Sequence, residues 1–208
     1  MLHYETISDE TLGLLKNIQS LDLFKDTRLV GGTALAIQYG HRKSIDLDFF
    51  GFITASDEQI EAELLQLGSL TVIRKSKDIK IYTLNDIKID FVNYPYIWLE
   101  TCIEEDNIRL ARPSDIGAMK LSAITGRGSK KDFFDLFFLL KNYTLDQLFS
   151  FYKNKFPQAS EFLVLKSLIY FEDAEHDADP DLFDKHIKWS FVKKQIQKAH
   201  GDYLKNLI

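Results

Sequence analysis

Three aspartates stand at positions where their side chains could bind a divalent metal ion. Asp46 and Asp48 are separated by one residue, and Asp90 lies between Ile89 and Phe91. In an extended strand, residues i and i+2 point to the same face, so Asp46 and Asp48 would project together. Two such carboxylates repel each other unless a cation is present. The pattern predicts a site for magnesium, with manganese as the alternative, because hard cations prefer carboxylate oxygens.

Asp90 would complete this cluster if its strand lies next to the strand of Asp46 and Asp48. Three carboxylates on adjacent strands can hold two metal ions, as phosphoryl and nucleotidyl transfer require. One ion lowers the pKa of the attacking hydroxyl, and the other neutralises the leaving pyrophosphate. The alternative is that these acids are solvent-facing positions of ordinary half-exposed strands.

A glycine pair upstream favours the metal site. Val30-Gly31-Gly32-Thr33 is typical of a strand that ends at two glycines, followed by a helix that begins at a hydroxyl residue. Glycines let the backbone approach a phosphate closely, and the N–H groups of a helix start attract the anion. Thirteen residues, 33–45, separate the glycine pair from Asp46, enough for a short helix that returns to an adjacent strand. We therefore expect Gly31, Gly32 and Thr33 to bind phosphates beside the carboxylates, although a simple turn is the alternative.

The composition is that of an ordinary globular protein. Of the 208 residues, 45% are hydrophobic and 27% are charged, which is the usual range for globular domains. The formal charge of −5 argues against a protein that coats nucleic acid without sequence preference, because such proteins usually carry an excess of basic residues. The single cysteine, Cys102, can form neither an internal disulfide nor a cysteine zinc site. A polar, acidic start and the lack of an apolar run near the ~20 residues of a membrane span predict a cytoplasmic protein without a membrane partner.

The first half of the chain alternates short strands with helices. Apolar residues spaced for one helical face predict helices, and alternation of apolar and polar residues predicts strands. The predicted helices are 8–20, 33–39 and 57–67, and the predicted strands are 28–30, 45–50, 70–74, 79–84, 87–92 and 107–110. The Asn85-Asp86 pair suits a tight hairpin, so the sheet should be mixed or antiparallel.

From Pro113 onward the pattern is helical. Helices are predicted to begin at Pro113, after the Gly126–Gly128 break, and at Thr144, where Gln147 completes a capping box. Residues 158–171 and 188–206 form the last two predicted helices. We therefore predict an α+β protein, with a small mixed sheet flanked by helices in residues 1–110 and a C-terminal helical region in residues 111–208. The acidic run 172–181 is expected to be a solvated loop, with contact to a basic partner as the alternative.

The order and spacing of the motifs resemble the nucleotidyltransferase superfamily of DNA polymerase beta. Members carry an apolar residue with two small residues, a spacer, an Asp-x-Asp pair and a later lone acid. This chain supplies Val30-Gly31-Gly32, then Asp46-Leu47-Asp48-Phe49, then Ile89-Asp90-Phe91. The resemblance implies that the predicted sheet is a nucleotidyltransferase sheet.

Two longer strings are similar to the AbiEii/AbiGii toxin family, nucleotidyltransferase-like proteins of bacterial toxin–antitoxin and phage-defence loci. The first string joins Gly31-Gly32-Thr33-Ala34-Leu35-Ala36 to residues 40–50. The second runs from Asp115-Ile116 through Met119-Lys120-Leu121 to Lys131-Asp132-Phe133-Phe134-Asp135-Leu136. The resemblance covers roughly residues 28–190.

Lys120, Asp132 and Arg42 are further candidates for the site. Lys120 lies one turn after Ile116, so its stem flanks the apolar stripe while its ammonium can reach a cleft. A surface lysine is the alternative, but the resemblance places a functional lysine here, which would brace a nucleoside triphosphate. The resemblance also implies an active-site role for Asp132, whose other explanation is the favourable position of a carboxylate in a first helical turn. Arg42, just before the metal strand, is a candidate phosphate ligand.

The predicted reaction moves a nucleoside monophosphate from a nucleoside triphosphate to an acceptor hydroxyl and releases pyrophosphate. Asp46 and Asp48 would bind both metals, and Asp90 would bind the catalytic ion and help to activate the acceptor. The resemblance implies a toxin that acts on RNA, with tRNA as one acceptor. It also implies that a separately encoded antitoxin neutralises this toxin. The alternatives are a small-molecule or protein nucleotidyltransferase and a nucleotide-binding module without turnover.

Overall fold

The computed structural model describes residues 2–206, and its contacts divide the chain into two compact units. The first, which we call the sheet unit, contains the residues up to Gly40 together with Ser44–Tyr96 and Thr101–Arg112. The second, the helical unit, contains His41–Lys43, Ile97–Glu100 and the chain from Pro113 onward. Because the chain passes from one unit to the other several times, neither unit is a single continuous segment.

The sheet unit is built on a mixed sheet. In the described residues it has seven strands in the order β3-β4-β5-β2-β1-β7-β6. The strands are β1 (Thr27–Leu29), β2 (Leu47–Gly51), β3 (Leu70–Lys75), β4 (Ile79–Leu84), β5 (Ile87–Asn93), β6 (Ile103–Glu105) and β7 (Ile108–Leu110). The pairs β2–β5 and β1–β7 run parallel, and the other neighbours run antiparallel. The predicted α+β class with a mixed sheet is confirmed.

Two tight hairpins have turns that use left-handed backbone. Asn85 and Asp86 join β4 to β5 with φ angles of 50° and 63°, at the turn that the sequence predicts. Asp106 and Asn107 join β6 to β7 with φ angles of 54° and 63°. Asn and Asp tolerate this region better than other non-glycine residues, and a turn of two such residues matches the twist of the flanking strands. The prediction missed β6 because three residues are too few to show an alternating pattern.

Burial alternates along the central strands and separates a closed face from a half-exposed one. The closed face consists of large apolar residues, none more than 1% exposed: Leu47, Phe49, Tyr82, Ile89 and Phe91. The opposite face, which we call the carboxylate face, carries Asp48, Lys88 and Asp90 at half-buried positions. The two-residue period of a strand therefore buries the apolar set and leaves the acids accessible.

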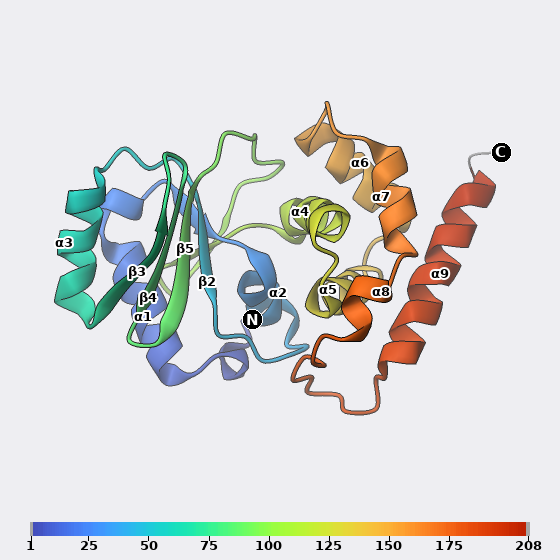
Figure 1. Ribbon diagram of the computed structural model, residues 1–208, viewed down its shortest axis with the longest axis horizontal. Coiled ribbons are helices and arrows are strands. Elements are labelled where there is room, and N and C mark those ends of the chain that lie inside the picture. Colours follow the sequence, from blue (N-terminus) through green and yellow to red (C-terminus); the bar gives the residue numbers. More distant parts are fainter. Residues whose placement is uncertain (1, 207–208) are drawn as a thin grey trace. The chain divides into compact units, whose positions relative to one another are not determined.

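Helices α1 (Asp9–Ser20) and α3 (Asp57–Leu67) lie side by side next to the strands (Figure 1). Ser8 caps α1, and Ser56 begins α3 with a full capping box, so both helices begin where the sequence predicts. Lys80 belongs to the closed face of β4 and lies 3.2 Å from Asp57 at the start of α3. This contact places α3 over the closed face and leaves the carboxylate face to the site.

Strand β2 begins at Leu47, two residues later than predicted, so Asp46 precedes it. The carbonyl of Asp46 accepts a hydrogen bond from the Thr33 hydroxyl and lies outside the strand ladder. Ile45 is 66% exposed, which also differs from the expected half-buried strand. The glycine-containing helix α2 (Gly31–Tyr39) begins two residues earlier than predicted.

The helical unit contains α4 (Pro113–Gly126), α5 (Lys130–Leu139), α6 (Leu145–Lys155), α7 (Glu161–Leu168), α8 (Glu172–Glu175) and α9 (Trp189–Asn206). The capping box of Thr144 and Gln147 at the start of α6 is confirmed. The predicted helix 158–171 is wrong at both ends, because Ser160 caps α7 and the helix ends at Leu168. Part of the acidic run is helical, and Asp177 accepts a hydrogen bond from the Lys130 N–H at 2.9 Å. The run is therefore more ordered than a solvated loop.

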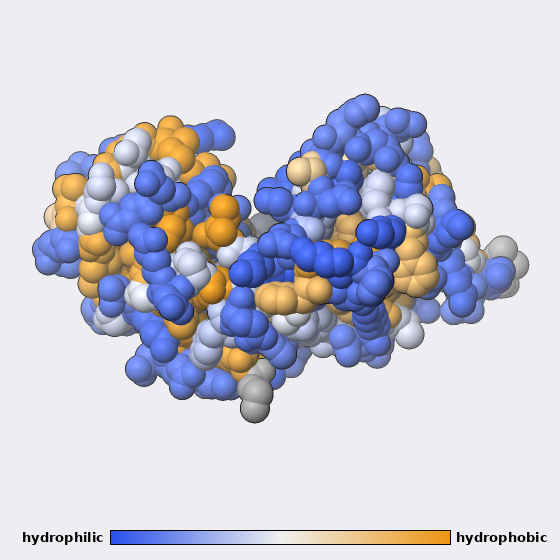
Figure 2. Space-filling model, turned by 90° about the horizontal axis from the view of Figure 1, so that it is seen from below, coloured by the Kyte–Doolittle hydropathy of each residue, from blue (hydrophilic) through white to orange (hydrophobic). Residues whose placement is uncertain are grey.

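The surface in the view of Figure 2 is mostly hydrophilic, with scattered hydrophobic patches. Within residues 2–206, none of the helices combines the length and the apolarity that crossing a membrane demands.

A fully buried ion pair lies in the core of the helical unit. Lys155 Nζ is 2.6 Å from Asp115 Oδ1, and neither side chain is exposed. Lys155 also donates to the Ile97 carbonyl at 2.8 Å, and Asp115 accepts from the Leu99 N–H at 3.0 Å. These bonds hold the segment Ile97–Glu100 against α4 and α6. Because removal of one partner leaves a buried charge uncompensated, such a pair is sensitive to single substitutions.

We expect Lys155→Met to lower the free energy of unfolding by about 3–5 kcal/mol, because Asp115 would remain buried without its cation. Lys153→Met is the matched control on the same helix, since Lys153 pairs with Glu161 at 2.9 Å in an exposed position and should contribute little. Urea unfolding of both variants at pH 7 measures the difference. Equal losses in the two variants would contradict the importance of the buried pair.

Candidate active site

The predicted phosphate loop and the predicted metal strand meet within the sheet unit. The Val30 N–H donates to the Asp48 carbonyl at 2.9 Å, and the hydroxyl oxygens of Thr33 and Ser44 lie 2.8 Å apart. Gly31 has a φ of +69°, and a Cβ at this position would overlap the Asp48 carboxylate. Glycine is therefore favoured here for two reasons, its tolerance of a positive φ and the space it leaves for the Asp48 carboxylate.

Asp48 and Asp90 lie directly opposite each other on the carboxylate face. The parallel register of β2 and β5 pairs Asp48 with Asp90 and Leu47 with Ile89. Neighbouring strands are about 4.8 Å apart, so two carboxylates at paired positions can reach one cation. Asp46 precedes β2, two residues before Asp48, and is half-buried as Asp48 and Asp90 are.

The carboxylate oxygens of Asp48 and Asp90 are the type of ligand that magnesium prefers. Asp48 and Asp90 supply hard oxygen ligands side by side, and magnesium takes one or two carboxylates and completes its shell with water and substrate phosphates. Across residues 2–206, His, Cys, Asp and Glu side chains form no group of three or more that could hold an ion as they stand. The Asp90 carboxylate is turned toward Lys88, whose Nζ lies 2.6 Å from Asp90 Oδ1.

A second cluster of charged residues is centred on Asp135 in the helical unit. Its carboxylate is fully buried and lies 2.7 Å from Arg42 Nε, 2.6 Å from Lys120 Nζ and 2.9 Å from His41 Nε2. Burial would raise the pKa of Asp135, but Lys120 and Arg42 hold it well below its usual value. The carboxylate therefore stays ionised and holds α4, α5 and the segment His41–Lys43 together.

Asp132 binds the same lysine from the first turn of α5. Lys120 Nζ donates to Asp132 Oδ1 at 2.9 Å, while Arg127 Nε and Ser129 Oγ donate to Asp132 Oδ2 at 2.9 and 2.7 Å. Burial would raise the pKa of Asp132, but the charge of Lys120 and the hydrogen bond from Arg127 lower it to about 2. Burial lowers the pKa of Lys120, and Asp135 and Asp132 more than offset this effect, so that the lysine stays charged.

The predicted residues of the helical unit therefore have defined surroundings. Lys120 is only 5% exposed, so the surface-lysine alternative is wrong. Arg42 is also buried, and its guanidinium donates to Asp135 and to the Lys43 carbonyl. No role was predicted for Asp135 from the sequence. The signal was its spacing of three residues from Asp132, which puts both acids on one helical face.

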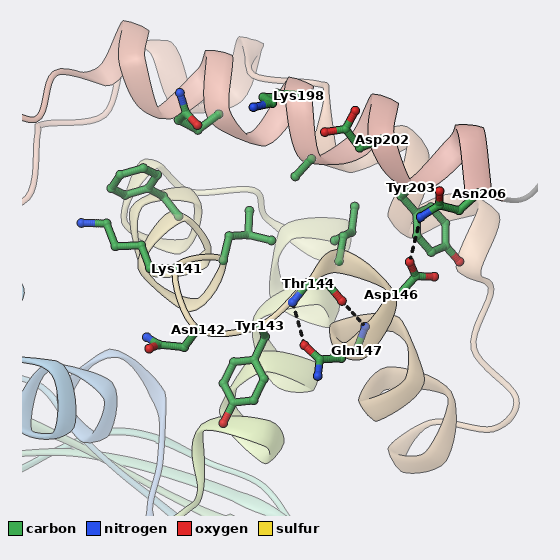
Figure 3. Close-up of a pocket in the computed structure, with 15 residues that line it drawn as sticks. Lys141, Asn142, Tyr143, Thr144, Asp146, Gln147, Lys198, Asp202, Tyr203 and Asn206 are labelled. Carbon is green, nitrogen blue, oxygen red and sulfur yellow. Dashed lines mark hydrogen bonds between the residues drawn. The ribbon is translucent and has the colours of Figure 1, made fainter.

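The helical unit also has an open groove of about 530 Å³. Figure 3 shows its polar rim, formed by Lys198 and Asp202 of α9 and by Lys141 and Asn142 after α5. The groove contains none of the residues predicted for the site. Its lining combines the buried side chains of Phe137, Leu145 and Tyr203 with polar residues, and it includes none of the buried cations described above.

We expect Gly31→Ala to lower the free energy of unfolding by about 2 kcal/mol, because alanine is strained at positive φ and its Cβ would push against Asp48. Gly13→Ala is the matched control. Gly13 lies in α1 with nothing within 4 Å of an added Cβ, and alanine should stabilise that helix by about 0.5–1 kcal/mol. Chemical unfolding of both variants gives the two values. If Gly31→Ala does not lower the free energy of unfolding relative to Gly13→Ala, the close approach of residue 31 to the Asp48 carboxylate is contradicted.

The buried His41 should make stability depend on pH. Burial lowers the pKa of His41, against the opposing hydrogen bond to Asp135, so the ring is neutral in the folded protein. In the unfolded chain a histidine binds a proton near pH 6.5. The unfolded state then binds more protons below that pH, and this residue reduces stability as the pH falls, by up to about 1.4 kcal/mol per pH unit.

His41→Gln should remove this dependence between pH 7 and pH 5, whereas the exposed His176→Gln should keep it. Urea unfolding of both variants and the unmodified protein at several pH values measures the slope. The same slope in all three proteins would show that His41 does not cause it.

Comparisons with known proteins show the family and the fold of this chain. Residues 13–205 match the family model "Nucleotidyl transferase AbiEii toxin, Type IV TA system". An uncharacterized protein of Aquifex aeolicus (strain VF5) is 36% identical over 198 residues, which are 92% of this chain and 95% of the relative.

Solved structures share the fold at low sequence identity. JHP933 from Helicobacter pylori aligns with a TM-score of 0.56 and 21% identity, over 96% of each chain. The antibiotic-resistance factor ANT(2'')-Ia aligns with a TM-score of 0.52 and 15% identity, over 69% of this chain and 89% of that one. With a family model that spans nearly the whole sequence, this chain belongs to the AbiEii family of nucleotidyl transferase toxins of type IV toxin–antitoxin systems.

Proposed function

We propose that this nucleotidyltransferase is metal-dependent and moves a nucleoside monophosphate from a nucleoside triphosphate to an acceptor hydroxyl, with release of pyrophosphate. The observation that carries the proposal is the in-register pair Asp48 and Asp90, beside a helix start where Gly31 has a φ of +69° and leaves space for the Asp48 carboxylate. Carboxylates that can hold a cation next to N–H groups that can hold phosphate match the two ends of a metal-bound triphosphate.

Each residue of the sheet unit has a separate task in this proposal. Asp48 and Asp90 would hold magnesium or manganese from neighbouring strands, and Asp46 would add a third carboxylate. When bound, such ions would lower the pKa of the acceptor hydroxyl and neutralise the leaving pyrophosphate. Gly31, Gly32 and Thr33 would bind phosphate through backbone N–H groups, because the Thr33 hydroxyl already donates its one proton to the Asp46 carbonyl and also contacts Ser44 Oγ.

In the helical unit, Lys120 and Asp132 act as a charged pair. We propose that Lys120 offsets negative charge on the triphosphate and that Asp132 holds its ammonium in place at 2.9 Å. Arg42 has a positioning role, since direct contact with a phosphate would require its guanidinium to leave Asp135. Asp135 fixes both cations, so its charge supports the position of Lys120.

The acceptor that we propose is RNA, with tRNA as one candidate, and the family's type IV toxin–antitoxin system supports a separately encoded antitoxin as the partner. A small-molecule or protein acceptor is the second candidate. Its support is limited to the fold shared with the antibiotic-resistance factor ANT(2'')-Ia. Family membership argues for an enzyme rather than a module that only binds nucleotides.

Asp48→Asn tests the reaction, because it removes one negative charge and keeps nearly the same shape. We expect it to reduce transfer by roughly a hundredfold or more, since bound metals supply several kcal/mol of transition-state stabilisation. Asp86→Asn is the matched control. This acid lies at the exposed turn before β5, where asparagine also tolerates positive φ.

The assay incubates each purified protein with labelled nucleoside triphosphates, magnesium or manganese, and either total cellular RNA or a small-molecule and protein extract. Label should enter RNA with the unmodified protein and Asp86→Asn, and it should be lost with Asp48→Asn or after chelation of the metal. Equal transfer by both variants would contradict the metal site. Label in the extract but not in RNA would contradict RNA as the acceptor and would still support nucleotidyl transfer.

A further inference from the structure

Lys88 is a cation within the group of carboxylates, and the proposed reaction gives it no task. Its Nζ lies 2.6 Å from Asp90 Oδ1, where charge-assisted bonds are strong. Lys88 precedes Asp90 by two residues on β5, so both side chains project from the carboxylate face. The Asp90 side chain is 20% exposed and that of Lys88 is 42% exposed. The ammonium can therefore leave the carboxylate for solvent without crossing the core.

The sheet register places Lys88 next to the paired carboxylates. Asp48 pairs with Asp90, and Leu47 pairs with Ile89. Neighbouring strands are about 4.8 Å apart, and residues two apart on one strand, such as Lys88 and Asp90, are about 6.6 Å apart. One positive charge and two negative charges thus share this part of the carboxylate face.

An ammonium and a divalent ion cannot both lie against the same carboxylate oxygen without strong repulsion. Lysine is a compact charge on a flexible four-carbon stem, which suits it to occupy such a position and to move away from it. The ammonium therefore holds Asp90 when no metal is bound, and it must move aside when a metal binds there.

We propose that Lys88 is the internal counter-ion of Asp90 and competes with the divalent cation for that carboxylate. This inference rests on the metal site of the proposed function. In the absence of nucleotide, the competition weakens metal binding, because the ion must displace an existing ion pair and approach a positive charge. A metal-bound triphosphate brings its own negative charge, which reduces the repulsion from Lys88. Lys88 thus favours the metal that arrives with the nucleotide over the free metal.

Lys75 provides a matched control on the other face of the same sheet. It pairs with Glu61 of α3 at 2.8 Å, and its side chain is 38% exposed, close to the value for Lys88. Lys75 lies opposite Lys80 in the register of β3 and β4, and Lys80 belongs to the closed face. Removal of Lys75 therefore deletes the same charge and a similar ion pair away from Asp46, Asp48 and Asp90.

The test is a titration of the purified full chain with Mn²⁺ in the absence of nucleotide, with free Mn²⁺ measured by electron paramagnetic resonance. We expect Lys88→Met to lower the dissociation constant for Mn²⁺ by roughly tenfold, because a unit charge a few ångströms from a divalent ion is removed. Lys75→Met should leave the constant unchanged. Lys88→Arg keeps the cation and should also bind Mn²⁺ as the unmodified protein does. Near-ultraviolet circular dichroism checks the fold, and Lys88→Gln serves if the methionine variant does not fold.

Each outcome separates this inference from the proposed function. Tighter binding only in Lys88→Met supports the counter-ion. Equal binding by the unmodified protein and Lys88→Met overturns it and leaves the metal site standing. Equal tightening in Lys88→Met and Lys75→Met also overturns it, since net charge alone would then explain the effect. Lack of Mn²⁺ binding in every protein overturns the metal site and the counter-ion together.

Discussion

Asp48 and Asp90 occupy paired positions on neighbouring parallel strands, and carboxylates at that spacing repel each other unless a cation lies nearby. Several features of the sheet unit offset or accommodate this repulsion. The opposite face of the same strands is fully apolar and buried, which holds both strands in register against the repulsion. Gly31 leaves room for the Asp48 carboxylate, and Lys88 supplies a positive charge to Asp90. A bound metal ion would satisfy the same constraint more completely, because it carries two charges.

In the helical unit, by contrast, charged side chains are buried together with their partners of opposite charge. Asp135 is surrounded by Arg42, Lys120 and His41, and Lys155 is paired with Asp115. Buried ions lose much hydration energy, and their mutual attraction repays this loss only when every partner is present. These groups therefore contribute less to net stability than to a unique arrangement of the segments they join. The same network keeps the ammonium of Lys120 fixed between two carboxylates, which suits a residue that must hold one position.

The fold of this protein and the chemistry of its side chains support different conclusions. JHP933 and the antibiotic-resistance factor ANT(2'')-Ia share its fold at 21% and 15% identity, and a fold alone does not define a substrate. The family model covers residues 13–205 and defines the nucleotidyltransferase family. The sheet unit connects the two, because it contains the paired carboxylates of Asp48 and Asp90 and the backbone N–H groups at the start of α2. The choice of acceptor depends on surfaces that the motifs do not describe.

Much of the fold could be predicted from the sequence because its signals are local. The alternation around Asp48 and Asp90 predicted their strands, Asn85-Asp86 predicted the hairpin, and Thr144 with Gln147 predicted a helix start. Spacing alone also singled out Gly31, Asp48 and Asp90 as candidates. Only the tertiary structure decided that Asp48 lies across from Asp90, that Lys88 binds Asp90, and that Asp135 collects Arg42, His41 and Lys120. Lys88 and Asp90 are neighbours on β5, but the other contacts join residues from different elements. Their partners are therefore set by strand register and helix packing, which local periodicity does not encode.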